Sequence, residues 1–322
     1  MKIILLVFLV FSSLLIQAQN PSSTQTDSST IESKIYPGGR EVKETVTKRD
    51  LVYYRFYRNN TPQVTSTATY NKSGRSIGVS KEYDDDGKLL YSIDHDHGSW
   101  NVANKSAYPF YSVQQQMKRK ADELIAATYG REFLKNHVIW SVDGSYIYNQ
   151  AESGNWSDSF SSKPTKFLFR YDVKLDKTHV YKELIQFELD QTGKFIPNEF
   201  EAVSGFEKLA QVPAQGFNLS YKAAIEATKQ KSGIRNQPLQ GFLKWESLKK
   251  PSFYNGHFRF YVPIKTGSVE NLNPKGRSSV TDQFDVYSFN PWTGAFIEKK
   301  KMKAVRSWEE NSGSSTGLMP TE

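Results

Sequence analysis

The chain has 322 residues, a formal net charge of +8 and an aromatic content of 14%. It has no cysteine, which excludes disulfide bonds and a lipid-modified N-terminal cysteine, so its stability must come from buried apolar surface. The mean hydropathy of -0.60 excludes membrane spans beyond an N-terminal apolar segment.

The N-terminus has the pattern of a secretory signal peptide. Lys2 is followed by an apolar run that ends at Ile16, and the small residue Ala18 stands just beyond it. The run is shorter than the roughly 20 residues that span a bilayer. We therefore expect residues 1–19 to be removed and the protein to be exported, to the periplasm or out of the cell; an uncleaved N-terminal anchor is the alternative.

Polar segments flank the part of the chain that has residues to bury. Residues 20–33 are expected to form a disordered linker and residues 306–322 a disordered tail, because they contain few apolar side chains. Between them we expect three domains, at residues 34–105, 110–205 and 215–305. The expected fold class is α+β, with an N-terminal antiparallel β-repeat sheet followed by two units that each lay a helix on an antiparallel sheet.

The first domain repeats a strand and a turn. Tyr36, Tyr57, Tyr70 and Tyr83 each precede a cluster of turn residues. Units this short cannot bury a face alone, so we expect them to pair sideways into one antiparallel sheet.

Residues 70–93 resemble the MORN-like repeats of the family often described as YwqK-type antitoxin components. The residues that fit the repeat are Tyr70, Gly74, Arg75, Gly78, Glu82, Tyr83, Gly87, Lys88 and Leu89. The resemblance implies a sheet used for binding or as a spacer. The family name implies no antitoxin activity for an exported protein.

The second domain opens with a predicted helix. Ser112 can cap it, with Gln115 at the capping-box position, and Gly130 can end it. One face of this helix is apolar: Val113, Met117, Ala121, Leu124, Ile125 and Thr128. Residues 166–175 then alternate as a strand with one wet face, and a further strand leads through the Thr192-Gly193 turn into Phe195-Ile196.

The third domain repeats this order. A helix is predicted at residues 221–231, with Ser220 as its cap and Gly233 as its stop. A strand at residues 258–264 follows, and a hairpin at residues 284–298 carries a second Thr-Gly turn at Thr293-Gly294. The repeated order predicts a duplicated unit.

Together, residues 110–305 resemble a tandem of PepSY domains. The resemblance rests on the helix Ser-Tyr-Lys-Ala-Ala-Ile-Glu-Ala at residues 220–227, the strand at 258–264 and the Thr-Gly hairpin at 286–297. PepSY domains are non-catalytic modules of peptidase propeptides and exported envelope proteins, for which regulation or inhibition of peptidases has been proposed. The resemblance implies a binding role in the envelope and supplies no set of functional residues.

Two short motifs are interpreted as turns. The stretch from Gly74 to Gly78 fits Gly-x-Ser-x-Gly, but a nucleophile elbow needs a helix after its serine, and here another strand is predicted. The run from Asp84 to Gly87 lacks the alternating ligands and the glutamate of a calcium loop. Both motifs are therefore expected to be hairpin turns.

The densest group of possible metal ligands is Asp94, His95, Asp96 and His97. In an extended segment the two imidazoles point to the same side and begin a zinc or copper site. His137, His179 and His257 are isolated, so the set is incomplete. A polar loop is the preferred interpretation, and a metal-dependent hydrolase using His95 and His97 is the alternative.

Aromatic side chains are the candidate binding residues. Trp292 is expected at a turn tip, and Tyr53, Tyr54 and Tyr57 lie on one predicted strand. Exposed rings of this kind stack on a glycan or anchor a protein partner, although rings on both faces of a strand are also found sandwiched between layers.

The sequence therefore predicts an exported, non-enzymatic binding or regulatory protein of the cell envelope. Its partner is an unknown protein, such as a peptidase, or an envelope polymer; we expect no cofactor, no nucleic acid and no transmembrane span after signal cleavage. Basic clusters at residues 118–120, 249–250 and 299–301 are compatible with association at an anionic surface. A purely structural spacer is the remaining alternative.

Overall fold

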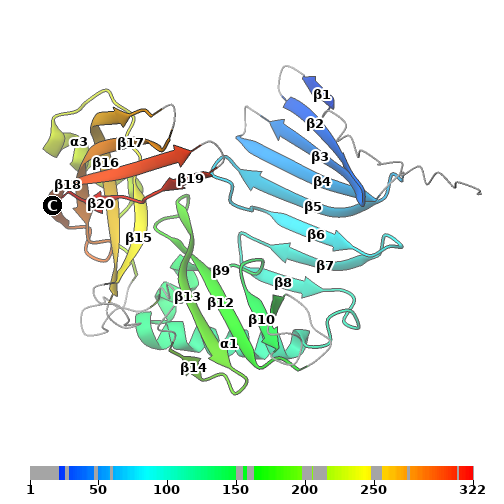
Figure 1. Cartoon of the computed structure of the whole chain (residues 1–322). Coiled ribbons are helices and arrows are strands. Elements are labelled where there is room, and N and C mark those ends of the chain that lie inside the picture. The colour runs from blue at the N-terminus through cyan, green and yellow to red at the C-terminus, as the bar shows by residue number, and fades with distance from the viewer. Residues whose placement is uncertain are drawn as a thin grey trace, which may run out of the picture. The chain divides into compact units, whose positions relative to one another are not determined.

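The computed structural model (Figure 1) describes residues 22–25, 29–46, 50–58, 61–149, 155–157, 163–197, 205, 216–247, 256–273, 276–309 and 312–321. The predicted signal peptide, residues 1–19, lies outside this range. The chain divides into two compact units, Met1–Ser92 and Ile93–Glu322. The described residues are mostly strands in antiparallel sheets, with three helices, which fits the predicted α+β class at that level. None of these helices is long and apolar enough to cross a membrane.

The first unit consists of one sheet whose strands follow each other in chain order. Pairing is antiparallel from β1 through β6. The strands are β1 (Ser22–Gln25), β2 (Ser29–Tyr36), β3 (Gly39–Val46), β4 (Leu51–Arg58), β5 (Val64–Asn71), β6 (Val79–Tyr83) and β7 (Leu89–Asp94). β8 (Ser99–Val102) completes the strand order, and the boundary between the units falls inside β7.

This sheet is a single layer. Within β2 to β6 the only buried residue is Gly39, and the other side chains are half-buried or exposed. Cross-strand pairs replace a core: the Tyr54 and Tyr70 rings lie 5.2 Å apart, and Lys43 Nζ lies 3.5 Å from Glu32 Oε2. The predicted disordered linker is wrong for residues 22–25 and 29–33, because β1 pairs with β2 and β2 pairs with β3 through backbone hydrogen bonds.

The hairpin turns share one construction. Asn71, Asp84 and Asp190 each open a turn, and their Oδ1 atoms accept the backbone N–H groups two and four residues later, at 2.8 to 3.1 Å. Gly74 and Gly87 close their turns at φ values of 77° and 78°. The prediction of a turn at residues 84–87 is confirmed. The predicted turn at 74–78 lies earlier, at residues 71–74, and Ser76 forms a bridge with Tyr70 before β6, so no helix follows it.

The first half of the second unit lays two helices against a six-stranded sheet of order β11-β10-β12-β13-β14, with β9 paired to β12. Its elements are α1 (Tyr111–Tyr129), α2 (Arg131–His137), β9 (Val138–Trp140), β10 (Tyr146–Asn149), β11 (Asn155–Ser157), β12 (Lys166–Lys174), β13 (Val180–Asp190) and β14 (Phe195–Ile196).

The apolar stripe of α1 and the inward face of β12 form the core of this half. Met117, Ala121 and Ile125 are buried, as predicted, and Phe167 and Phe169 are each 1% exposed. The predicted Ser112 cap is wrong: α1 begins at Tyr111 after Phe110, without a side-chain cap. Its first residue is held instead by the Tyr111 hydroxyl, which donates to the Trp100 carbonyl at 2.8 Å.

The second half has a separate sheet of order β15-β16-β17-β18-β19, with β20 paired to β18. Its elements are α3 (Tyr221–Ser232), β15 (Phe242–Ser247), β16 (Gly256–Asn271), β17 (Ser278–Phe289), β18 (Phe296–Glu309), β19 (Ser312–Ser315) and β20 (Met319–Pro320). The predicted caps of α3 are confirmed, because Ser220 Oγ accepts the Ala223 N–H at 3.2 Å and Gly233 takes the left-handed conformation.

The predicted disordered tail is wrong where the structure describes it. β18 continues to Glu309, and β19 and β20 both pair with it. Arg277 strengthens this arrangement by donating to Ser307 Oγ at 2.7 Å and Ser314 Oγ at 3.0 Å. A polar segment is ordered here because it adds backbone hydrogen bonds to a strand that is already in place.

Candidate functional site

Trp292 lies in the turn between β17 and β18, as predicted, but its ring is only 3% exposed. It stacks on Tyr129 with centroids 5.6 Å apart, and its ring lies 5.0 Å from Phe133 and 4.6 Å from Phe217. Tyr129 belongs to α1 and Phe133 to α2. The predicted exposed aromatic is therefore wrong, because the first half covers the turn, and Trp292 is part of a core shared by the two halves.

The other candidate aromatics lie on the single-layer sheet. Residues paired across antiparallel strands share a face, so the register places Tyr53 and Tyr57 on one face and Tyr54 on the other. We call these the Tyr53 face and the Tyr54 face. All three rings are half-buried, and the Arg40 guanidinium lies 4.7 Å over the Tyr57 ring. No described helix or second sheet of the first unit sandwiches them.

The segment from Asp94 to His97 forms the turn between β7 and β8. Asp94 Oδ1 accepts the backbone N–H groups of Asp96 and His97, and the His97 Nδ1 lies 2.8 Å from Asp94 Oδ2. His95 is 8% exposed whereas the His97 side chain is 80% exposed. The segment is a turn rather than an extended strand, so it does not place the two imidazoles on one side as an extended segment would. Within the described ranges no group of three or more His, Cys, Asp or Glu side chains is placed to hold a metal ion.

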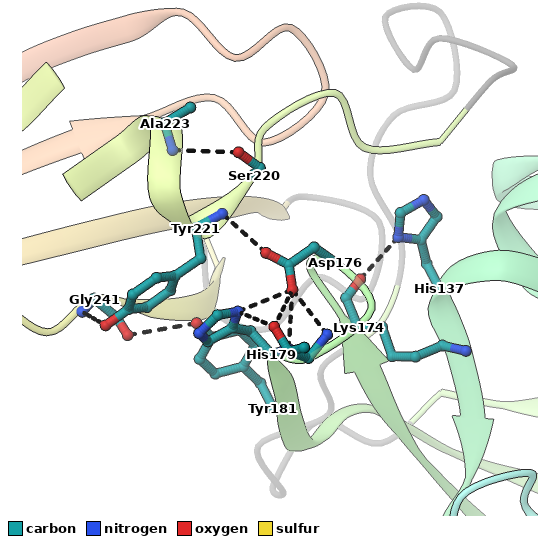
Figure 2. Close-up of polar contacts among 10 residues, drawn as sticks. His137, Lys174, Asp176, His179, Tyr181, Ser220, Tyr221, Ala223 and Gly241 are labelled. Carbon is teal, nitrogen blue, oxygen red and sulfur yellow. Dashed lines mark hydrogen bonds and ion pairs between the residues drawn. The ribbon is translucent and has the colours of Figure 1, made fainter. Parts of the chain in front are cut away.

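A polar junction joins the two halves of the second unit (Figure 2). Asp176, in the turn after β12, accepts the backbone N–H of Tyr221 at 3.0 Å with one oxygen. Its other oxygen accepts the N–H groups of Thr178 and His179, each at 3.0 Å. The His179 ring contacts the same carboxylate at 2.9 Å and stacks on the Tyr221 ring with centroids 3.8 Å apart.

This junction lowers the pKa of Asp176 well below its ordinary value. Burial acts in the opposite direction, but the hydrogen bonds from Tyr221, Thr178 and His179 outweigh it. The ionised carboxylate also lies at the N-terminus of α3, where the helix dipole favours negative charge. Its hydrogen-bonding capacity is used within the protein, so we assign this Asp-His pair a structural role.

His137 makes a second polar link between the halves. Its Nδ1 lies 2.8 Å from the Lys174 carbonyl, and its Nε2 accepts the Phe217 N–H at 3.2 Å (Figure 2 shows the first contact). This arrangement requires a neutral imidazole. Burial lowers the pKa of His137, and the charge of Lys174 acts in the same direction, against the hydrogen bond to the Lys174 carbonyl.

We expect acidification to destabilise the second unit through His137. Since its folded-state pKa is lowered, the unfolded state takes up the proton first, and stability is lost as the pH falls below the ordinary histidine value of about 6.5. Denaturant unfolding of wild type and His137→Gln between pH 7.5 and 5 measures this loss. The variant is expected to show a flatter pH profile; parallel profiles for wild type and His137→Gln contradict the assignment.

A third polar cluster lies on the sheet of the second half, on the face opposite the one that packs against α3. Glu246 on β15 lies 3.2 Å from the His257 Nε2 and 3.8 Å from the Arg259 Nε, and it accepts the Tyr261 hydroxyl. Arg259 also contacts Glu298 at 3.1 Å. Burial raises the pKa of Glu246, but the contacts with His257 and Tyr261 and the charge of Arg259 outweigh it and lower the pKa to about 2. The carboxylates and cations of this cluster face one another.

Sequence reasoning treated His137, His179 and His257 as isolated. In the structure His137 contacts Lys174 and Phe217. His179 contacts Asp176, three residues earlier, and Tyr221 of α3, while His257 contacts Glu246 on the neighbouring strand. The polar groups around Asp176 and His137 use their hydrogen bonds within the protein. The single-layer sheet presents aromatic and charged side chains on both of its faces, and we take it as the candidate functional site.

Comparisons with known proteins assign no family. No family model matches the chain, and no curated protein matches it. A solved structure described as the crystal structure of lipopolysaccharide binding protein is 8% identical, covers 94% of this chain and 70% of that chain, and has a TM-score of 0.15. A score this low does not indicate a shared fold.

Proposed function

We propose that the protein is an exported, non-enzymatic binding protein of the cell envelope and that the N-terminal sheet is its contact surface. The observation that carries this proposal is the single layer itself. Tyr53, Tyr54 and Tyr57 occupy both of its faces, and the described residues of the first unit form no second layer over them. Broad, flat faces with half-exposed aromatic rings suit contact with a macromolecule.

The finer assignments belong to the same proposal. We assign the sheet to MORN-like repeats and residues 110–305 to two PepSY-like units, located in the periplasm or outside the cell. The repeated succession of helix, long strands, Thr-Gly turn and closing strand supports the second assignment. In this proposal the partner is a protein such as a peptidase or a polymer of the envelope.

The test is saturable retention of the chain lacking residues 1–19 by an envelope extract. One double variant, Tyr53→Ala with Tyr57→Ala, alters the Tyr53 face; a second, Tyr54→Ala with Tyr70→Ala, alters the Tyr54 face. We expect at least one of them to weaken retention about tenfold, since truncated aromatic anchors commonly account for that much binding. Circular dichroism checks that the sheet is retained.

An unrelated protein of equal net charge is the control for non-specific retention. Equal retention of that protein, or unchanged retention of both double variants, contradicts the proposed function.

A further inference from the structure

The two faces of the N-terminal sheet differ in charge. On strands β2 to β6 the Tyr54 face carries three cations and three carboxylates, and opposite charges meet across strands: Lys43 pairs with Glu32, and Lys34 stands opposite Glu41. The Tyr53 face of the same strands carries three cations, Arg40, Arg55 and Lys81, against one carboxylate, Glu44. The Tyr53 face therefore has an excess of positive charge.

The cations of the Tyr53 face alternate with aromatic rings. Tyr53, Arg55 and Tyr57 follow one another on the same face of β4, so the Cα atoms of the two tyrosines are about 13 Å apart with Arg55 between them. Across the sheet, Arg55 is paired with Thr67 and Thr67 with Lys81, which places the Cα atoms of the two cationic residues about 10 Å apart in one row.

Arg55 and Lys81 are also available to a ligand. Both side chains are exposed, and neither makes an ion pair with a carboxylate among the residues that the structure describes. Arg40 is less available to a ligand, because its guanidinium lies over the Tyr57 ring. The face thus offers two exposed cations beside two tyrosine rings, of which Tyr57 packs under the Arg40 guanidinium.

We propose that the Tyr53 face binds an acidic polysaccharide, a chain of uronic acid units being the simplest example. This inference rests on the proposed function and names its ligand class. Each sugar ring of such a chain has an apolar face that stacks on tyrosine and a carboxylate that pairs with arginine or lysine. A linear chain that repeats these two features matches a row that alternates rings and cations.

The excess of positive charge on the Tyr53 face would also attract an anionic lipid surface. The side chains that lie between the cations favour the polysaccharide over lipid. Insertion into lipid requires protruding apolar side chains. The exposed aliphatic residues of this face, Ile35 and Val79, lie on β2 and β6, whereas the centre of the face is occupied by Tyr53, Arg55 and Tyr57.

The experiment measures binding of polygalacturonate to the chain lacking residues 1–19 by calorimetry at low and at physiological salt. Arg55→Gln with Lys81→Gln is the test variant, and Lys34→Gln with Lys43→Gln is a control that removes the same charge from the Tyr54 face. We expect the test variant to bind about tenfold more weakly and the control to change by less than about twofold. Wild-type affinity is expected to fall with salt, and neutral dextran is expected not to bind.

Equal losses in both double variants, no binding of polygalacturonate, or preferential binding to phosphatidylglycerol vesicles each overturns the inference. The outcome is separable from that of the proposed function. Retention by an envelope extract that depends on the sheet aromatics, without polygalacturonate binding, leaves the proposed function standing and removes the polysaccharide. Loss of both signals removes both.

Discussion

Replacing Trp292 by alanine is expected to lower the free energy of unfolding of the second unit by about 3–5 kcal/mol. The ring is 3% exposed and lies among Tyr129, Phe133, Phe217 and Phe258, whose centroids are 4.6 to 6.5 Å from its own. These rings come from both halves of the unit, so the cavity left by the substitution weakens both. Denaturant unfolding followed by circular dichroism measures the change without depending on tryptophan fluorescence.

Trp308→Ala is the matched control for this substitution. Trp308 is 42% exposed on β18, so its removal is expected to change stability by less than about 1 kcal/mol. Trp292→Phe keeps an aromatic ring in the cluster, so its loss of stability is expected to lie between those of Trp292→Ala and Trp308→Ala. A Trp292→Ala protein as stable as Trp308→Ala would show that the turn is not covered by the first half.

Local patterns predicted the elements whose signals are local. The α3 boundaries follow from Ser220 and Gly233, and the inward faces of β12 and β16 follow from the alternation of apolar residues. The predicted wet face of β12 is wrong in part, because Leu168 and Asp172 on that face are buried. The hairpin turns follow from short residue patterns. In each, an aspartate or asparagine side chain accepts backbone N–H groups within the turn, and a glycine adopts the positive φ that closes it. These features depend on neighbours within a few residues.

Errors arose where a distant segment determines the environment. Trp292 sits at a turn tip, which predicts exposure, yet Tyr129 and Phe133 from more than 150 residues earlier cover it. The strands β1, β19 and β20 have little apolar content and were predicted to be disordered. They are ordered because a neighbouring strand offers unpaired backbone groups.

The candidate site was predicted only in part. The tyrosines of β4 were identified from the sequence, but the sequence of one strand does not show which cations share a face with them. The pairing of Arg55 with Thr67 and of Thr67 with Lys81 depends on the register of three strands. A turn of different length before β6 would place Lys81 on the opposite face.

Replacing Asp176 by asparagine is expected to destabilise the second unit by about 1–2 kcal/mol, the range for a half-exposed hydrogen bond to a charged group. Asparagine keeps an oxygen for the turn N–H groups of Thr178 and His179 but sets an amide donor against the Tyr221 N–H. Urea unfolding at pH 7 measures the loss.

Asp190→Asn provides the matched control, because Asp190 opens a turn of similar design in the same sheet. Its hydrogen bonds are to Thr192 and Lys194 within its own turn, so its replacement is expected to change stability by less than about 0.5 kcal/mol.

The pH dependence separates the effect of the Asp176 charge from that of its geometry. Since the folded-state pKa of Asp176 is lowered, its contribution to the free energy of unfolding is complete above the ordinary value of 3.8 and is lost as the pH falls below it. The gap between wild type and Asp176→Asn should therefore narrow below about pH 4, and a gap that stays constant there, or an equal loss in Asp190→Asn, contradicts a charged junction between the two halves.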